Sequence, residues 1–141
     1  MLRDVRPADL PVFYEQQLDP ESTRMAAFPA RERAAFDAHW EKILRDRMVR
    51  ANAIVADGAV AGNVVSFRKD GKTEVGYWLG REFWGRGIAT RALAEFVRSV
   101  DERPLHAGVA KHNAGSIRVL EKCGFRRCGE EEDGMLLFEL R

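Results

Sequence analysis

The sequence predicts an α/β (α+β) fold in which helices flank a mixed, mainly antiparallel sheet with one parallel pair of strands. Three observations support this prediction. Short β-rich runs are separated by Asp-Gly pairs, which are strong signals for hairpin turns. Two helical segments interrupt these runs in the second half of the chain. One of them connects two strands as a crossover, and a crossover joins parallel strands.

The N-terminal region predicts one strand followed by two helices. Leu2 to Val5 is a short strand that ends before Pro7. Ala8 to Leu18 has a weak helical pattern, and Pro29 to Met48 is a clearer helix. Apolar residues recur at helical spacing in this second helix, namely Phe36, Trp40, Ile43, Leu44 and Met48.

Three antiparallel strands are expected next. Ala53 to Ala56 and Val60 to Phe67 are β-rich runs joined by Asp57-Gly58. Asp70-Gly71 makes a second turn before the strand from Thr73 to Leu79. Asp-Gly favours the positive φ angles of a type I′ turn, so each pair predicts a tight hairpin.

A helix that follows Gly87 has one apolar face opposite a charged face, and it leads to a buried strand at Leu105 to Val109. The strand from Thr73 and the strand from Leu105 are therefore predicted to be parallel. A second helix runs from about Ser116 to Cys123 and is capped by a glycine.

The third Asp-Gly pair, Asp133-Gly134, joins Phe125–Glu132 to Met135–Leu140 as a final hairpin. The complete predicted order is β-α-α-β-β-β-α-β-α-β-β. Because no repeat or linker interrupts it, residues 1–141 are expected to form a single domain.

Composition limits the classes of partner. The 23 basic and 22 acidic residues nearly cancel, so neither a nucleic acid nor a membrane surface is expected as a partner. No apolar run approaches the roughly 20 residues that span a bilayer, and no secretory signal begins the chain. Cys123 and Cys128 are interpreted as reduced, mostly buried thiols of a cytoplasmic protein. Without clustered histidines they make a poor metal site, so no metal is expected.

The segment with the clearest chemistry is a glycine-containing turn between a strand and an amphipathic helix, Gly85-Arg86-Gly87. Free amides and the positive dipole end make such a helix start an anion site, suited to a phosphate or pyrophosphate. Neither a P-loop nor a dinucleotide fingerprint fits, because Lys-Ser/Thr is absent and Thr90 stands where the third glycine belongs. A tight turn without a ligand is the structural alternative.

Two motifs resemble those of the GNAT superfamily of N-acetyltransferases. Trp84 to Ala89 is similar to the acyl-CoA motif Gln/Arg-x-x-Gly-x-Gly/Ala, although Trp84 replaces the usual Gln or Arg. His112 to Phe125 is similar to the second hallmark, Asn-x-x-Ser followed by Glu-Lys-x-Gly-Phe. The predicted order of elements is also that of the family. The branch that the chain most resembles includes ribosomal-protein-alanine and small-amine acetyltransferases.

The resemblance implies that acetyl-CoA is the acyl donor and that the thioester lies between two splayed parallel strands. The turn amides would hold the pyrophosphate, and the end of the preceding strand would pair with the pantetheine arm. Asn113 and Ser116 would lie near this arm, although both residue types also cap helices. The implied cofactor-binding residues are Trp78, Leu79, Gly80, Gly85, Arg86, Gly87, Ile88, Ala89, Thr90, Asn113 and Ser116.

The implied reaction is direct attack of an amine on the thioester, and it needs a base because amines are protonated near neutral pH. Glu74 matches an acidic position of this branch and is the candidate base; a solvated side chain beside a turn is the alternative. Relatives often place a tyrosine acid seven residues after the Asn, but here that residue is Leu120. Tyr77 and His112 are possible substitutes.

The function expected from the resemblance is N-acetylation of a primary amine, either a small molecule or a protein N-terminus, by a monomer or homodimer. The alternative is a non-catalytic sensor or interaction module that binds acyl-CoA, which the leucine at position 120 also fits.

Overall fold

The computed structural model describes residues 1–141, and its seven strands form one sheet in the order β1-β2-β3-β4-β5-β7-β6. All neighbouring strands are antiparallel except β4 and β5, which form the predicted parallel pair. The strands are β1 (Leu2–Asp4), β2 (Arg50–Ala56), β3 (Ala59–Lys69), β4 (Lys72–Leu79), β5 (Leu105–Val109), β6 (Arg126–Glu130) and β7 (Leu136–Leu140).

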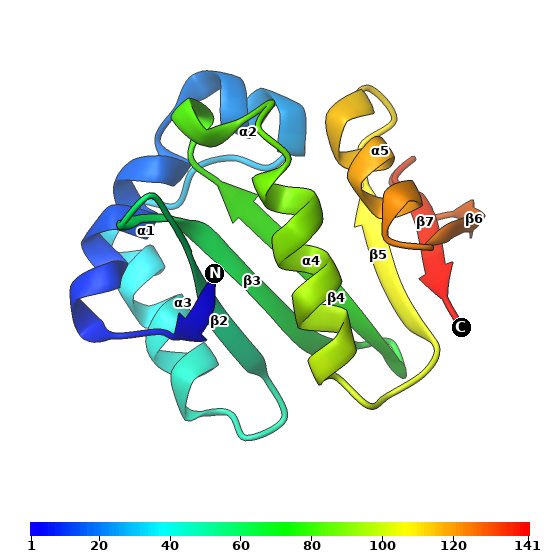
Figure 1. Ribbon diagram of the computed structural model, residues 1–141, viewed down its shortest axis with the longest axis horizontal. Helices are drawn as coiled ribbons and strands as arrows, with labels where there is room; N and C mark the ends of the chain where they lie inside the picture. Colours follow the sequence, from blue (N-terminus) through cyan, green and yellow to red (C-terminus); the bar gives the residue numbers. More distant parts are fainter.

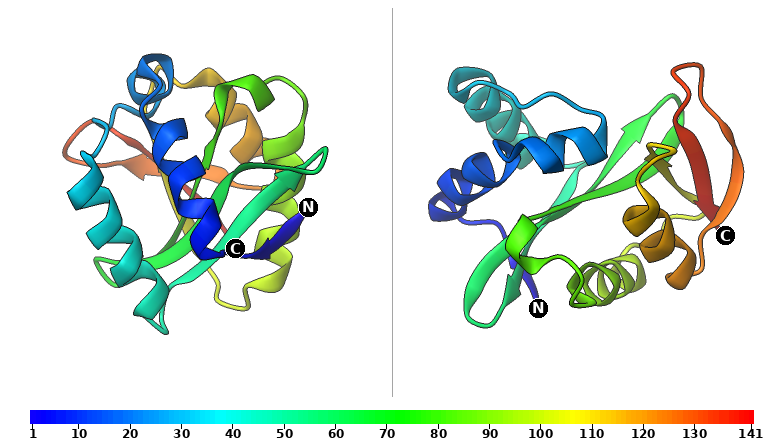
Figure 2. Two further views of the ribbon diagram at one scale, coloured as in Figure 1. Left: turned by 90° about the vertical axis from the view of Figure 1, so that its left-hand side faces the viewer. Right: turned by 90° about the horizontal axis from the view of Figure 1, so that it is seen from above.

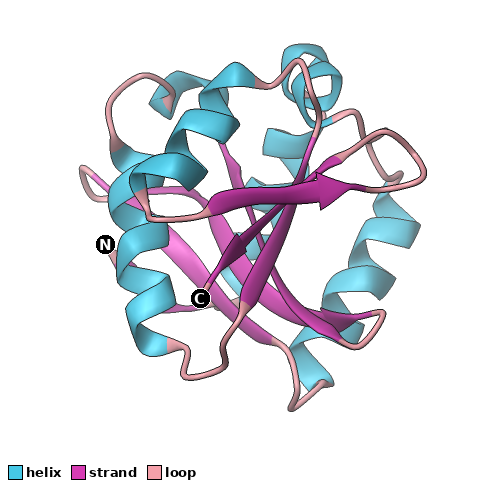
Figure 3. Cartoon of the chain, turned by 90° about the vertical axis from the view of Figure 1, so that its right-hand side faces the viewer, coloured by secondary structure: helices cyan, strands magenta, loops and turns pink.

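Helices cover both faces of this sheet (Figures 2 and 3), with α1 and α3 on one side and α4 and α5 on the other. The helices are α1 (Leu10–Gln17), α2 (Pro20–Ala26), α3 (Arg33–Arg45), α4 (Ile88–Ser99) and α5 (Ala114–Lys122), with 3-10 turns η1 (Pro7–Asp9) and η2 (Arg81–Phe83). None of the helices is long and apolar enough to cross a membrane.

The predicted order of elements is correct except that three helices, not two, separate β1 from β2. The missed helix is α2, which Asp19 caps by accepting a hydrogen bond from the Ser22 amide at 3.1 Å. The helix predicted over Pro29–Met48 is shorter, because Gln17 holds the residues before α3 in an extended loop. Its side chain accepts from the Arg31 amide at 2.7 Å and donates to the Arg31 carbonyl at 3.0 Å.

The first two Asp-Gly pairs form the predicted tight turns, whereas Asp133-Gly134 lies in a longer turn that still joins β6 and β7 as antiparallel neighbours. Asp57 and Gly58 have φ angles of 53° and 75°, and Asp70 and Gly71 have 51° and 76°. Positive φ at both central residues identifies these as type I′ turns, whose twist matches that of the flanking strands. The local turn chemistry therefore fixes the hairpins β2–β3 and β3–β4.

The parallel strands β4 and β5 pair only at their starts, where Thr73 lies opposite Leu105 and Glu74 opposite His106. Beyond this point they diverge toward their carboxyl ends, as Figure 1 shows. The splay that the family resemblance implied is therefore present, and it interrupts the sheet between β4 and β5.

Two apolar clusters hold the helices on the sheet. The larger one, between the sheet and helices α4 and α5, is centred on Phe96, Leu93 and Leu105, each 1% exposed or less. The smaller one joins Phe13 of α1 and Trp40 of α3 to the other face, with ring centroids 5.0 Å apart. Of the two clusters, only the larger one contributes residues to the gap between β4 and β5, among them Val75, Leu93 and Val109.

Asp9 is the ionic link between the first strand and the helices. It is 3% exposed and accepts hydrogen bonds from the Arg3 guanidinium at 2.7 and 2.8 Å and from the Arg6 amide at 2.7 Å. The hydrogen bonds from Arg3 lower the pKa of Asp9 below its usual value of 3.8 and outweigh the opposing effect of burial. The stability that this carboxylate contributes is therefore present above that value and is lost as the pH falls through the lower folded pKa.

We expect Asp9→Asn to lower the free energy of unfolding at pH 7 by about 2 kcal/mol, because it removes charge-assisted hydrogen bonds from a buried site. Urea unfolding at pH 7 and pH 3 measures this difference, which should shrink at the lower pH. Asp4→Asn, at an exposed position, is the control and should change little. An equal loss for Asp9→Asn at both pH values would contradict the ionic account.

Candidate functional site

A cleft of about 480 Å³ lies where β4 splays from β5. Its walls come from the end of β4, the start of α4, one face of α5 and part of α2. This volume falls in the range of small-molecule and cofactor sites. Nine of the eleven predicted cofactor-binding residues line it: Trp78, Leu79, Gly85, Gly87, Ile88, Ala89, Thr90, Asn113 and Ser116.

The glycine turn at the start of α4 presents unpaired backbone donors. Gly85 and Gly87 have φ angles of 73° and 75°, which the absence of a Cβ permits. Gly87 occupies the N-cap and has no capping side chain, so the amides of Ile88, Ala89 and Thr90 have no partner within the chain. Free amides and the positive end of the helix dipole together form an anion site.

Basic side chains lie on the opposite wall of this cleft. Gly115, Arg118, Val119 and Lys122 form one stripe of α5 that faces the cleft, at the spacing of one helical face. Arg86 does not line the cleft: its guanidinium pairs with Asp57 and lies 5.8 Å from the Phe83 ring centroid. The basic side chains that line the cleft therefore come from α5, while Arg91 of α4 lies against the turn outside the cleft and donates to the Arg86 carbonyl at 3.4 Å.

The backbone at the end of β4 faces the cleft at alternate residues. Gly80 donates its amide to the Ala61 carbonyl at 2.8 Å, and Trp78 lies opposite Asn63 on the same neighbour, β3. Because polar groups along a strand point alternately to its two sides, Leu79 turns its amide and carbonyl toward the gap. Tyr77, two residues earlier in β4, also turns its amide and carbonyl toward the gap. The edge of β4 that faces the gap is thus made by Tyr77 and Leu79. Gly80 does not line the cleft and uses its amide within the sheet.

Trp84 connects the glycine turn to this edge. Its indole Nε1 donates to the Leu79 carbonyl at 2.9 Å, and its ring lines the cleft. A Gln or Arg was expected at this position of the motif. Here the indole supplies a hydrogen-bond donor and an apolar wall together.

A chain of hydrogen bonds joins the edge of β4 to the start of α5. The Tyr77 hydroxyl donates to Ser116 Oγ at 3.0 Å, and Asn113 Oδ1 accepts from the Ser116 amide at 3.2 Å. Asn113 therefore caps α5 and also lines the cleft, as the two interpretations of this residue allowed. Burial raises the pKa of Tyr77 more than the bond to Ser116 lowers it, so the hydroxyl keeps its proton. Leu120 is buried and offers no acid.

Glu74 lies on the other face of the sheet, outside the cleft. It is 6% exposed, so the alternative of a solvated side chain is wrong, and its burial raises the pKa of the carboxyl. Residues two apart in a strand share one face of the sheet. Glu74 and Gly76 of β4 therefore lie on the face opposite α4 and α5, and so do His106 and Gly108 of β5. A smaller cavity of about 120 Å³ between the diverging strands is lined by Gly76 and Gly108. A Cβ at Gly76 would meet no atom within 4 Å, so there is open space on the Glu74 side of this strand.

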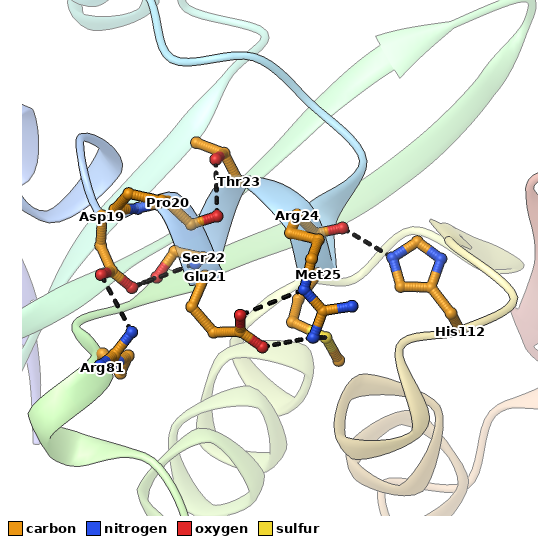
Figure 4. Close-up of polar contacts among 9 residues, drawn as sticks. All are labelled: Asp19, Pro20, Glu21, Ser22, Thr23, Arg24, Met25, Arg81 and His112. Atoms are coloured by element: carbon orange, nitrogen blue, oxygen red, sulfur yellow. Dashed lines mark hydrogen bonds and ion pairs between the residues drawn. The ribbon is translucent and has the colours of Figure 1, made fainter.

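Helix α2 crosses the mouth of the cleft and is fastened at both ends (Figure 4). At one end Asp19 pairs with Arg81 of η2 at 3.3 Å. At the other end His112 Nε2 donates to the Arg24 carbonyl at 2.6 Å. Ser22, Met25 and Ala26 of α2 face the cleft, so this helix forms a cover between α4 and α5.

Sequence reasoning missed the residues of α2 and the basic stripe of α5. The Asp19-Pro20 pair is a helix-start signal that would have revealed α2. Arg118 and Lys122 at i and i+4 would have revealed a basic face of α5, because Ile117 and Leu120 point toward the core. Which face lines a cleft depends on tertiary packing, and no local pattern encodes it.

Comparison with known proteins agrees with this geometry. A family model described as "Acetyltransferase (GNAT) domain" matches residues 1–126. The chain is 30% identical over 103 residues to the putative ribosomal N-acetyltransferase YdaF of Bacillus subtilis, covering 68% of this chain and 56% of that protein. It is 44% identical over 59 residues to the probable N-acetyltransferase YjcK of the same organism, covering 39% and 33%. The chain thus spans between a third and just over half of the curated relatives it matches.

Solved structures show the same fold. An aminoglycoside acetyltransferase AAC(6')-Ib in complex with coenzyme A superposes with a TM-score of 0.83 at 18% identity, covering 100% of this chain and 93% of that one. The same enzyme with coenzyme A and kanamycin gives a TM-score of 0.81 at 20% identity, covering 100% and 93%. The splayed strands, the glycine turn and the family match lead to one conclusion: this chain belongs to the GNAT acetyltransferase family.

Proposed function

We propose that this protein is an N-acetyltransferase that moves the acetyl group of acetyl-CoA to a primary amine, with residues 1–141 as one catalytic unit. The observation that carries the proposal is the cleft at the splay of β4 and β5, which begins at the unpaired amides of α4. An anion site joined to a free strand edge suits a long ligand with a phosphate at its middle and an amide-containing arm.

In this proposal the pyrophosphate binds the amides from Gly85 to Thr90, opposite the basic side chains of Arg118 and Lys122. The pantetheine arm extends β4 as an added strand and bonds to Tyr77 and Leu79. Asn113 offers its side-chain amide to the same arm, because only its Oδ1 is used for capping. The thioester then lies in the gap between Gly76 and Gly108.

Trp84→Phe tests the role of the indole in holding the end of β4. Phenylalanine keeps an aromatic wall but leaves the Leu79 carbonyl without its donor, so the dissociation constant for acetyl-CoA should rise about 3- to 10-fold. Calorimetric titration measures this change. Phe83→Leu, which alters the same wall without removing a hydrogen bond, is the comparison. An unchanged dissociation constant for Trp84→Phe would show that the indole acts by packing alone.

The proposed reaction joins the nitrogen of a neutral amine to the thioester carbonyl and breaks the carbon–sulfur bond. Glu74 takes the proton that the amine loses, across the open space at Gly76, directly or through one water molecule. The amides of Tyr77 and Leu79 are candidates to stabilise the oxyanion. The Tyr77 hydroxyl, held by Ser116, is the candidate donor to the leaving thiolate in place of the acid that Leu120 cannot supply.

We propose that the amine enters from the face of the sheet opposite α4 and α5. Near β5 and β7 this face carries no helix in Figure 2, and Gly108 is exposed there. The two unpaired cysteines suit the reducing cytoplasm as the site of the reaction. A monomer or homodimer that engages neither nucleic acid nor membrane remains part of this proposal.

Release of free thiol from acetyl-CoA in the presence of amine acceptors tests the proposal. Two acceptors distinguish a small-molecule amine from a protein N-terminus as the substrate: kanamycin, and a peptide with an unblocked N-terminal alanine. Turnover with either acceptor supports an enzyme and selects its class of amine. Acetyl-CoA binding without thiol release for a broad set of amines would instead favour an acyl-CoA sensor. The leucine at position 120, where relatives often have a tyrosine acid, fits that alternative.

A further inference from the structure

Three residues that bind transition metals meet on the sheet face opposite the cofactor cleft. His106 of β5, Cys128 of β6 and Glu139 of β7 offer one imidazole nitrogen, one thiol sulfur and one carboxylate oxygen. These atoms all lie within 4.8 Å of one another. None of the three residues lines the cleft, so the cluster is separate from the proposed acetyl-CoA site.

His106 lacks the hydrogen bonds that a buried imidazole needs. It is 7% exposed, and its Nδ1 is fully buried without a partner. Its Nε2 faces Glu139 Oε2 at 3.6 Å, beyond the length of a hydrogen bond. Buried polar atoms are nearly always paired, so an imidazole with neither nitrogen hydrogen-bonded is unusual and leaves Nε2 free to bind an ion beside Glu139.

The spacing suits a metal ion. Zinc holds nitrogen, oxygen and sulfur ligands at about 2.0 to 2.3 Å, so two ligands at a tetrahedral angle are about 3.4 to 3.6 Å apart. The distance from His106 Nε2 to Glu139 Oε2 has this value. Cys128 lies next to the irregular register at Arg127/Gly129 on the edge strand, where a small shift of the backbone can bring its sulfur closer.

The carboxylate is already oriented for this role. Arg141 Nε donates to Glu139 Oε1 at 3.0 Å, which leaves Oε2 directed at His106. Such outer hydrogen bonds fix the geometry of metal ligands. Cys128 is exposed, contrary to the buried thiols expected from the sequence, because β6 is the edge strand of the sheet. An ion can therefore reach it from solvent.

We propose that His106, Cys128 and Glu139 bind one Zn²⁺, with a water molecule as the fourth ligand. Three protein ligands and an open position are one of the common arrangements of zinc in proteins. When the ion binds, the thiol of Cys128 releases its proton to solvent and the thiolate bonds to the metal. The ion would link the edge strand β6 and its neighbour β7 to β5.

Titration of the purified, metal-stripped protein with Co²⁺ tests the site through its own spectrum. One equivalent should produce a thiolate-to-cobalt charge-transfer band and the visible bands of tetrahedral cobalt, and Zn²⁺ should displace both. Cys128→Ser, an exposed substitution, should abolish the charge-transfer band, whereas Cys123→Ser, the matched control, should keep it.

Glu139→Gln should weaken binding of Co²⁺ at least about tenfold. Glu130→Gln, on neighbouring β6 but paired with Lys111 outside the cluster, should leave it unchanged. Thermal unfolding of each variant without metal establishes that it is folded. No charge-transfer band in the unmodified protein, or a band that persists in Cys128→Ser, would overturn the proposal whether or not the protein acetylates an amine.

Discussion

Replacing Gly87 by valine is expected to raise the dissociation constant for acetyl-CoA at least about 100-fold, equivalent to about 2.7 kcal/mol of binding free energy. Gly87 has a φ angle of 75°, which a β-branched residue adopts only with strain. A Cβ at this position would also lie 3.0 Å from Arg91 Nη1. Valine would therefore distort the turn and displace the amides that the pyrophosphate needs.

The matched control is Gly71→Val, because Gly71 has nearly the same φ angle, 76°, in the β3–β4 turn outside the cleft. Both substitutions carry the same backbone strain, so both should lower the unfolding temperature by similar amounts. Only Gly87→Val should lose acetyl-CoA in a calorimetric titration. If both variants bound acetyl-CoA with the same dissociation constant, the glycine turn at Gly87 would have no part in binding the cofactor.

Glu74→Gln is expected to lower kcat for amine acetylation about 100-fold or more, the usual contribution of a positioned general base. Glutamine has nearly the same shape as the buried carboxyl but cannot accept the proton of the attacking amine. Glu74 lies outside the cofactor cleft, so the dissociation constant for acetyl-CoA should stay unchanged. Steady-state thiol release and calorimetry measure the two quantities separately.

Glu131→Gln is the comparison, because Glu131 is partly exposed, pairs with Lys69 and contributes to the raised pKa of Glu74 through its charge. Its kcat should remain within a few-fold of the unmodified protein, and Glu74→Asp should recover part of the activity that Glu74→Gln loses. An unchanged kcat in Glu74→Gln would remove this residue from the reaction and leave the amine to lose its proton to solvent.

Most of the sheet follows from local chemistry. Asp57-Gly58 and Asp70-Gly71 adopt the positive φ angles that Asp tolerates and that Gly, without a Cβ, favours, so the hairpins and their antiparallel order were predictable. The parallel pair followed from the crossover helix. Helix α2 is short and polar, so it lacks the apolar periodicity that reveals the other helices in the sequence.

The candidate site also has features that were predictable from local sequence and features that depend on tertiary packing. The turn at Gly85 and Gly87 was predictable because strand, glycines and helix are contiguous. The position of Arg118 across the cleft, and the use of the Gly80 amide within the sheet, arise from tertiary packing and strand register. The meeting of His106 with Cys128 and Glu139 depends on β7 lying between β5 and β6, which no spacing in the sequence encodes.

The central claim is that the cleft between β4 and β5 binds acetyl-CoA. Isothermal calorimetry of the unmodified protein with acetyl-CoA tests it most directly, with desulfo-coenzyme A as a ligand that keeps the pyrophosphate and the pantetheine arm. One molecule of each per chain, bound with a micromolar dissociation constant, is the predicted result. No measurable heat of binding for either ligand at millimolar concentration would contradict the claim and leave the fold without its proposed acyl donor.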